Sequence, residues 1–319
     1  MTPGRSCPLH YRYAPTVFDR DADIRAETIY VIGGLYGNVP ALEAVLELAA
    51  AELVKPTLVF NGDFNWFNID VESFNAINCE VLQHVALRGN VEAELVTDAD
   101  DAGCGCAYPE YVDDADVERS NAIMQRLQAT SRAAPSLTHS LLSLPMHAVA
   151  EVGGVRFGIV HGDAESLAGW RFAHDGLHEP ANIAWLTQIC RDAKLAGFAS
   201  SHTCLPTFRH FARDSAELFV INNGAAGMPN FSRTQYGLIS RFSVHPAEEG
   251  LSQYGHVFGN VHVDAIPVHY DAARFQYSFV ENWPENSPAH QSYFHRIVDG
   301  PAYAPPHALG LIRAPLVCA

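Results

Sequence analysis

Five short segments of the chain combine glycine with Asp, Asn or His directly after a predicted buried strand, and this recurrence restricts the possible folds most. The segments are GGLYGN (33–38), NGDFN (61–65), RGNVE (88–92), VHGD (160–163) and SSHTCLP (200–206). In open α/β sheets, ligands bind at the carboxyl ends of strands, so such strand ends converge on one site. Glycine beside each polar residue allows tight turns and close backbone approach. The sequence therefore predicts an α/β fold with one polar site.

Helices alternate with strands early in the chain, and strands dominate later. We expect strands at residues 28–34, 57–63, 84–90, 155–163, 197–203, 216–224, 236–244 and 256–268. We expect helices at residues 40–54, 120–130 and 181–197, with a loop rich in aspartate at 97–116. Asn38 and Pro40 suit the N-cap and the first turn of the first helix. This order predicts two packed sheets flanked by helices.

The chain is interpreted as one domain, 1–319. Its length of 319 residues fits one large domain or two small ones, and no internal repeat or low-complexity tract divides it. The motif core covers about 28–245, and a C-terminal extension covers about 246–319. From about residue 270 we expect a mostly helical and irregular wrap around the core.

The composition limits the partners. A net charge of −16, from 36 acidic and 20 basic residues, repels polyanions, so nucleic-acid polymers and acidic membranes are not expected as partners. A small phosphorylated substrate remains compatible, because a bound cation inverts the local potential. There is no run of 18 apolar residues and no signal-like N-terminal segment. Seven irregularly spaced cysteines suit reduced thiols, so we expect a cytoplasmic protein.

The polar residues at the strand ends form a mixed set of oxygen and nitrogen donors. Asp63 offers a carboxylate oxygen and Asn90 an amide oxygen, whereas His161 and His202 offer imidazole nitrogens. This set suits a divalent transition metal (Mn, Fe or Zn) better than Mg or Ca. A single histidine after a strand is more often a packing or surface residue. The order and spacing of all four together indicate a metal site.

This ordered series resembles the calcineurin-like metallophosphoesterase superfamily, which runs Asp-x-His, Gly-Asp, Gly-Asn-His, a strand-end His and Gly-His-x-His. The resemblance covers about residues 28–224. It includes GNVPALEAVL after the first motif, LRGN after the third strand, and INNGAAGMP, where the family has a strand and a glycine-rich turn. It implies a four-layer αββα sandwich of two mixed sheets flanked by helices. It also implies two adjacent metals bridged by an aspartate and a hydroxide.

The resemblance assigns one complete metal position. Asp63 is similar to the bridging aspartate, and Asn90 to the asparagine of Gly-Asn-His. His161 matches the strand-end histidine, and His202 the first histidine of Gly-His-x-His. Asp63, Asn90 and His202 are accordingly expected to be the catalytic residues. Arg88 beside the third motif and His174 after the fourth are expected to bind the substrate.

The second metal position departs from the family pattern. Residues 34–36 read Gly-Leu-Tyr in place of Asp-x-His, and Cys204 replaces the second histidine of Gly-His-x-His. Only Asp63 and Cys204 remain as its ligands, whereas zinc-like ions normally take three or four from the protein. Val91 replaces the histidine that contacts the phosphoryl group in the family, which favours either a substrate with a good leaving group or a different acid. One or two ions are therefore expected.

Three functions stay open at this point. The favoured one is hydrolysis of a phosphomonoester, phosphodiester or nucleotide by a metal-activated hydroxide at a one-metal or rearranged two-metal site. The second is a degenerate relative that binds a metal or phospholigand without turnover, because Tyr36 fills space that a metal needs. The third is a thiol metal site made by Cys104, Cys106 and Cys204, for which Cys-x-Cys is a weak signal.

Overall fold

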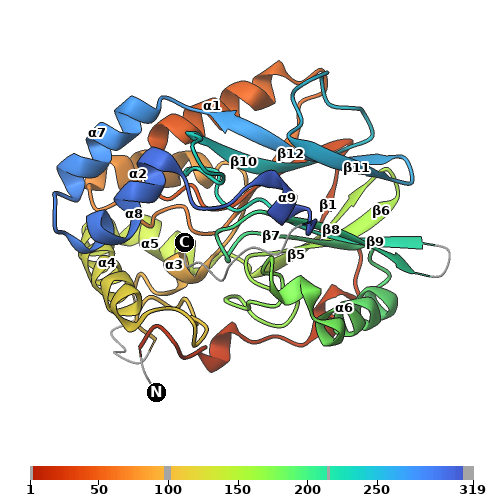
Figure 1. The fold of residues 1–319 in the computed structure, drawn as a ribbon, viewed down its shortest axis with the longest axis horizontal. Coiled ribbons are helices and arrows are strands. Elements are labelled where there is room, and N and C mark those ends of the chain that lie inside the picture. The colour runs from red at the N-terminus through yellow and green to blue at the C-terminus, as the bar shows by residue number, and fades with distance from the viewer. Residues whose placement is uncertain (1–2, 97–101, 214–215, 312–319) are drawn as a thin grey trace.

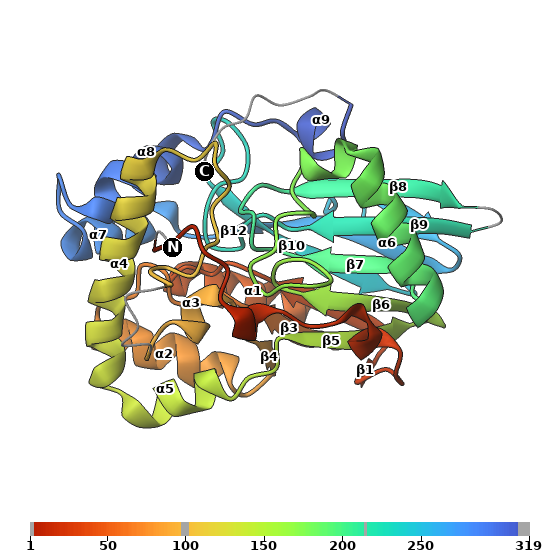
Figure 2. The ribbon, with the colours of Figure 1, turned by 90° about the horizontal axis from the view of Figure 1, so that it is seen from below.

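Two sheets packed face to face form the centre of the molecule, and helices cover both outer faces (Figures 1 and 2). The computed structural model describes residues 3–96, 102–213 and 216–311. Each sheet has six strands, and both sheets mix parallel and antiparallel pairs. The predicted four-layer αββα sandwich is therefore confirmed.

The first sheet has the order β11-β12-β10-β2-β3-β4. Its strands are β2 (Thr28–Ile32), β3 (Thr57–Asn61), β4 (Val85–Leu87), β10 (Tyr236–Ser243), β11 (Tyr254–Phe258) and β12 (Val261–His269). β2, β3 and β4 are parallel, and the other three pair antiparallel with their neighbours. The parallel strands bring their carboxyl ends, which precede three of the predicted motifs, to one edge.

The second sheet has the order β1-β5-β6-β7-β9-β8. Its strands are β1 (Ile24–Arg25), β5 (His147–Val152), β6 (Val155–Val160), β7 (Gly197–Ser200), β8 (Thr207–Arg213) and β9 (Ala216–Asn222). β6, β7 and β9 are parallel, so the histidine motifs after β6 and β7 lie at neighbouring strand ends.

Helices cover the outer faces unequally. They are α1 (Val39–Ala51), α2 (Val71–Val81), α3 (Asn90–Ala93), α4 (Asp114–Arg132), α5 (Pro135–Leu142), α6 (Pro180–Ala193), α7 (Ala272–Asn282), α8 (Pro288–Asp299) and α9 (Pro305–Ala308). α6 packs on the second sheet, whereas α1, α2, α4, α7 and α8 contribute to the core beside the first. Among the described residues, no helix is long and apolar enough to cross a membrane.

Alternation along the strands creates the separate core layers. In β2, Ile29 and Val31 point into the layer between the sheets, while Tyr30 and Ile32 pack with the helices. All four side chains are buried. A strand buried on both faces reads as a continuous apolar run, which explains the sequence TIYVI. The first helix starts as expected, because the Asn38 side chain accepts a hydrogen bond from the Ala41 amide.

Several boundaries differ from the sequence expectations. The expected strand at 256–268 is two strands, β11 and β12, because Gly259 at φ 63° allows a tight turn between them. α4 begins at Asp114 rather than 120, since Asp113 caps it by accepting from the Ala115 amide. Of the expected loop at 97–116, residues 97–101 lie outside the described part. The tail is helical, as predicted.

Candidate metal centre

Two glycines allow the ends of β3 and β4 to meet the end of β6. Gly62 has a φ of 78°, and a Cβ there would lie 2.5 Å from the Gly89 nitrogen and 2.6 Å from His161 Nδ1. A Cβ on Gly89 would lie 2.3 Å from Asp63 Oδ1. These separations are too short for any side chain. Glycine at both positions is therefore a packing requirement of the site.

Asp63 follows β3 in a left-handed conformation, with a φ of 56°. Its Oδ1 accepts a hydrogen bond from the Val91 amide at 3.2 Å. The buried carboxylate of Glu92 fixes the surrounding loop, because it accepts from the amides of Asp63 and Phe64 at 2.8 and 2.9 Å. The carboxylate of Asp63 is thus held in one orientation, with 5 % of the residue exposed.

The two histidines are oriented by backbone carbonyls. His161 Nδ1 lies 2.9 Å from the carbonyl oxygen of Asn61, and His202 Nε2 lies 3.0 Å from that of Cys106. A carbonyl oxygen accepts only, so each of these nitrogens carries the proton. In the neutral rings, His161 Nε2 and His202 Nδ1 therefore keep their lone pairs. These two nitrogens face each other at 3.2 Å.

Asn90, the first residue of α3, is oriented in the same way. Its Nδ2 donates to the carbonyl of Cys104 at 3.0 Å, so its Oδ1 faces His161 Nε2 at 3.1 Å. Cys104 and Cys106 thus serve the site through their carbonyl oxygens. The two clusters of potential ligands found among the described residues contain no cysteine.

Four acceptor atoms now converge: Asp63 Oδ1, Asn90 Oδ1, His161 Nε2 and His202 Nδ1, here named the acceptor cluster. His161 Nε2 lies 3.1 to 3.3 Å from the other three. Buried acceptors with no donor between them repel one another, so the cluster favours a positive charge among them, either a proton on a histidine or a cation. Two imidazoles, one carboxylate and one amide oxygen fit a divalent transition metal.

The pKa values of the cluster reflect this demand for positive charge. Burial lowers the pKa of His161, but the Asp63 carboxylate outweighs it and the net shift is upward. Burial and the neighbouring His161 lower the pKa of His202 to about 3. Burial acts to raise the pKa of Asp63, yet His161 holds it below its ordinary value. The raised pKa of His161 and the lowered pKa of Asp63 both reflect the attraction between the carboxylate and a positive charge, and a bound cation would supply that charge in place of a proton.

Protein side chains occupy the space around Gly34, where the resemblance to the family implied a ligand of a second metal. A Cβ on Gly34 would lie 2.9 Å from Tyr36 Cζ, so the tyrosine ring folds back over the place of the missing aspartate side chain. The Tyr36 hydroxyl lies 2.9 Å from Cys204 Sγ, and we name these two residues the tyrosine–cysteine pair. Both have positive φ angles, 53° and 59°. Cys204 also lines the cavity described below.

A buried arginine lies behind this pair. Arg296 on α8 donates from Nη2 to the Cys204 carbonyl at 2.6 Å and from Nε to the Pro229 carbonyl at 3.3 Å. Only 4 % of the residue is exposed, and its Nη1 has no hydrogen-bond partner among the described residues. The altered half of the site therefore has a guanidinium beside it, supplied by the C-terminal extension.

Asp63, Asn90 and His202 of the acceptor cluster line a cavity that is partly open to solvent. Six aromatic side chains line the cavity: Tyr36, Trp66, Tyr108, Tyr111, Trp170 and Tyr293. No lysine or arginine is among the described residues that line it. Trp170 packs edge-on against His202, with ring centroids 5.3 Å apart, and its Nε1 donates to the Cys106 carbonyl at 3.0 Å.

The two expected substrate-binding residues differ in position. His174 lines the cavity, is 8 % exposed, and its Nε2 has no hydrogen-bond partner among the described residues. Arg88 instead donates from Nη1 to the Leu142 carbonyl at 2.9 Å, at the end of α5. This contact ties α5 to the strand end, so the geometry gives no support to phosphate binding by Arg88.

Sequence reasoning missed the residues that support and enclose the cluster. Glu92 had a local signal, because it stands three residues after Gly89 and accepts from that amide at 3.0 Å. Trp170 and Tyr293 had none, since they reach the cavity from loops and helices distant in sequence.

Comparisons with known proteins place this architecture. No protein-family model and no curated protein matches the sequence. A solved metallophosphoesterase from Sphaerobacter thermophilus is similar over 86% of this chain and 100% of its own, with 18% identity and a TM-score of 0.52. A hypothetical protein from Pyrococcus horikoshii is similar over 86% of this chain and 99% of its own, with 16% identity and a TM-score of 0.57. The chain has the fold of the calcineurin-like metallophosphoesterases.

Proposed function

We propose that the protein hydrolyses a phosphate ester and that a divalent transition metal, bound by the acceptor cluster, is its cofactor. The observation that carries this proposal is the convergence of four oriented acceptor atoms at the edge of an open cavity. A bound Mn, Fe or Zn ion would supply Lewis acidity there, which stabilises charge on phosphoryl oxygens and lowers the pKa of water. The tyrosine–cysteine pair supports one ion rather than two.

The protein residues have separate tasks in this proposal. Asp63 supplies the one formal negative charge of the ligand set, and Asn90, His161 and His202 complete it. The carbonyls of Cys104 and Cys106 orient Asn90 and His202 by accepting hydrogen bonds from their side chains. His174 lines the cavity, and its Nε2 has no hydrogen-bond partner among the described residues. Position 91 is valine and offers no proton, so the leaving group departs as a stable anion.

The aromatic walls favour a substrate with an aromatic group. Trp170 and Tyr108 lie with ring centroids 6.0 Å apart and both line the cavity. Aromatic rings bind other rings by edge and face contacts that add to the burial of apolar area. An aryl phosphodiester satisfies both features, because its phenolate leaving group needs little protonation. This small phosphorylated substrate also agrees with the acidic surface, which disfavours nucleic-acid polymers.

The second candidate function is binding without turnover. The tyrosine–cysteine pair favours it, because a buried phenol stands where a second ion would share the reacting oxygens. A protein of this kind binds one metal and a phosphorylated ligand in the cavity and releases the ligand unchanged.

Metal content and turnover separate the two candidates. The purified chain is freed of metal, reloaded with Mn²⁺ or Zn²⁺, and assayed with bis(4-nitrophenyl) phosphate and 4-nitrophenyl phosphate. We expect faster release of nitrophenol from the diester, and loss of activity in Asp63→Asn. The Arg88→Ala variant is the matched control and should retain activity. A loaded protein that binds the diester but releases no nitrophenol would establish the binding function instead.

A further inference from the structure

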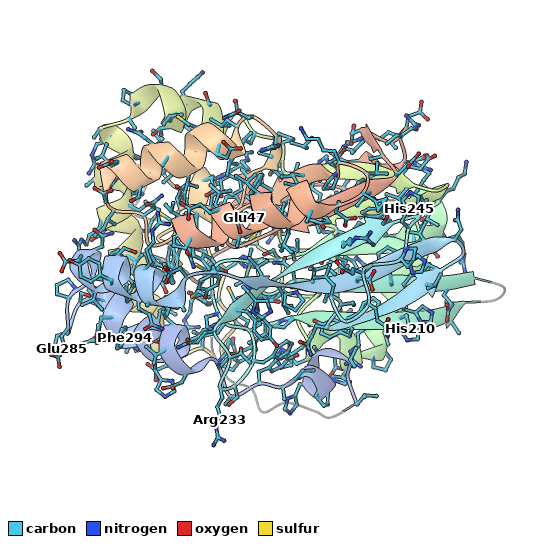
Figure 3. All side chains as sticks on the ribbon, turned by 90° about the horizontal axis from the view of Figure 1, so that it is seen from above. Glu47, His210, Arg233, His245, Glu285 and Phe294 are labelled. Carbon is cyan, nitrogen blue, oxygen red and sulfur yellow. The ribbon has the colours of Figure 1, made fainter. Side chains whose placement is uncertain are left out.

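Two histidines and a glutamate form a second cluster of potential ligands at the end of the sandwich remote from α7 and α8 (Figure 3). His210, Glu217 and His256 are here named the edge triad. His256 Nε2 lies 2.9 Å from Glu217 Oε2, and His210 Nδ1 lies 3.7 Å from Glu217 Oε1. The two imidazoles are stacked, with centroids 4.4 Å apart and planes at 15°. One carboxylate thus faces a nitrogen of both rings.

Strand register explains why these three side chains meet. Each lies two residues from a phenylalanine of the layer between the sheets, in Phe208-x-His210, Glu217-x-Phe219 and His256-x-Phe258. Side chains two apart on a strand share a face. The triad therefore extends the aromatic layer between the sheets outward into solvent. Its members come from β8 and β9 of one sheet and from β11 of the other.

The donor atoms already have nearly the spacing of a zinc site. Tetrahedral zinc with ligands at about 2.0–2.1 Å needs donor atoms separated by about 3.3 Å. The two measured nitrogen–oxygen separations, 2.9 and 3.7 Å, bracket this value. All three donors lie within 4.8 Å of one another. The two rings are nearly parallel and must turn toward each other to aim both nitrogens at one ion, and all three side chains are partly exposed.

We propose that the edge triad binds a divalent transition metal, with zinc as the best fit, in a site separate from the acceptor cluster. Two imidazoles and one carboxylate are a zinc ligand set that leaves the fourth position to water. The ion connects the edge strand of the second sheet, β8, to the edge strand of the first, β11. Because these strands belong to different sheets, the ion acts as a cross-link that holds the open end of the sandwich together.

Zinc titration of the full chain tests the proposal. Calorimetry on the metal-free Asp63→Asn variant, in which the acceptor cluster is weakened, should still detect binding of about one Zn²⁺. Adding His256→Ala or His210→Ala should weaken that binding by roughly 10-fold or more, since each change removes one of three ligands. His245→Ala is the matched control, because His245 is also exposed and contacts a carboxylate, Glu27 Oε2, at 3.3 Å. That control should change nothing.

Thermal unfolding supplies a second readout. Zinc should raise the Tm of the parent and of His245→Ala further than that of His256→Ala, because the cross-link stabilises only the folded state. A variant with intact zinc affinity after loss of His210 or His256 would overturn the proposal. Equally weak zinc binding in the Asp63→Asn chain and in both histidine variants made from it would also overturn the proposal, because it would identify an adventitious ion only. Asp63 changes do not bear on these outcomes, so the proposed hydrolysis can fail while the edge site stands.

Discussion

The acceptor cluster and the region of the tyrosine–cysteine pair both lie at strand ends, but their electrostatic environments are opposite. The acceptor cluster brings four acceptors together and leaves its demand for positive charge to a proton or a metal. In the half with Gly34, Tyr36 and Cys204, the phenol and the thiol are in hydrogen-bonding contact with each other, and the buried guanidinium of Arg296 lies beside them. The comparison teaches that one strand end gathers acceptor atoms, whereas the other is filled by an aromatic ring and a thiol next to a fixed positive charge.

Glycine serves different purposes in the two halves. At positions 62 and 89 the backbone itself must approach within contact distance of Asp63 and His161. At position 34 the glycine makes room for the ring of Tyr36. At positions 62 and 89, glycine allows the acceptor atoms to converge. At position 34, glycine allows a tyrosine ring to fill the space.

The largest expected effect comes from removing the charge of the acceptor cluster. Asp63→Asn removes the single formal negative charge opposite the cation, whereas Asn90→Ala removes a neutral oxygen donor. Metal affinity should fall by more than about 100-fold for Asp63→Asn, since even changes outside the ligand set cost about 10–100-fold. The loss for Asn90→Ala should be clearly smaller. Calorimetric titration with Mn²⁺ measures both. Equal affinity in parent and both variants would place the cation elsewhere, and the edge triad would become the leading alternative, because it is the second cluster of potential ligands among the described residues.

The next effect in size is the pH dependence of metal binding to the acceptor cluster. The pKa of His161 is raised in the metal-free protein, so below that pKa a proton must leave Nε2 before a metal can bind. Metal affinity should therefore increase about tenfold per pH unit up to the pKa of His161 and level off above it. Titrations in two buffers with different ionisation enthalpies count the released proton. Affinity that does not change with pH between about 5 and 8 contradicts a protonated His161.

A smaller effect is expected at the tyrosine–cysteine pair. Tyr36→Phe keeps the ring over Gly34 and removes only the hydroxyl that contacts Cys204 Sγ. The free energy of unfolding should fall by about 0.5–1.5 kcal/mol, the usual contribution of one hydrogen bond. Metal affinity should change little, because the Tyr36 hydroxyl is not one of the four atoms of the acceptor cluster. Urea unfolding and titration measure the two quantities, and a large change in affinity would show that the halves are coupled.

The smallest expected effect tests whether one added imidazole at position 204 allows a second ion to bind in the cavity. Cys204→His supplies one imidazole, but Gly34 and Tyr36 still provide no ligand, so the cavity should continue to hold one ion. Anomalous scattering from crystals of the manganese-loaded variant counts ions in the cavity and separates them from any at the edge triad. Two ions in the cavity of this variant, against one in the parent, would show that a second ion can bind without ligands from Gly34 and Tyr36.

Local sequence patterns predicted the layers and the acceptor cluster, because both depend on strand ends. Buried strands such as β2, β3 and β6 read as apolar runs, and each is followed by its polar residue. β8 was not expected, since Arg209 and His210 interrupt its apolar pattern. The strand is made by pairing with β9 and by the contact of Phe208 with Phe258, which are long-range properties.

Residue roles at the site were predictable only where a motif carried them. Asp63, Asn90, His161 and His202 stand in ordered motifs, and their side chains converge. Arg88 stands beside a motif, yet the C-terminal carbonyls of α5 compete for its guanidinium. The place of α5 depends on tertiary packing that no local pattern encodes. The ligand roles themselves remain predictions until a metal is measured.

Completion of the cavity wall by α8 has a consequence for the order of events during synthesis. The last member of the acceptor cluster is residue 202, but Tyr293 and Arg296 come about 90 residues later. A domain generally folds as a unit, and in this one the ligands are synthesised before α8. The cavity therefore takes its final shape only after α8 has been made.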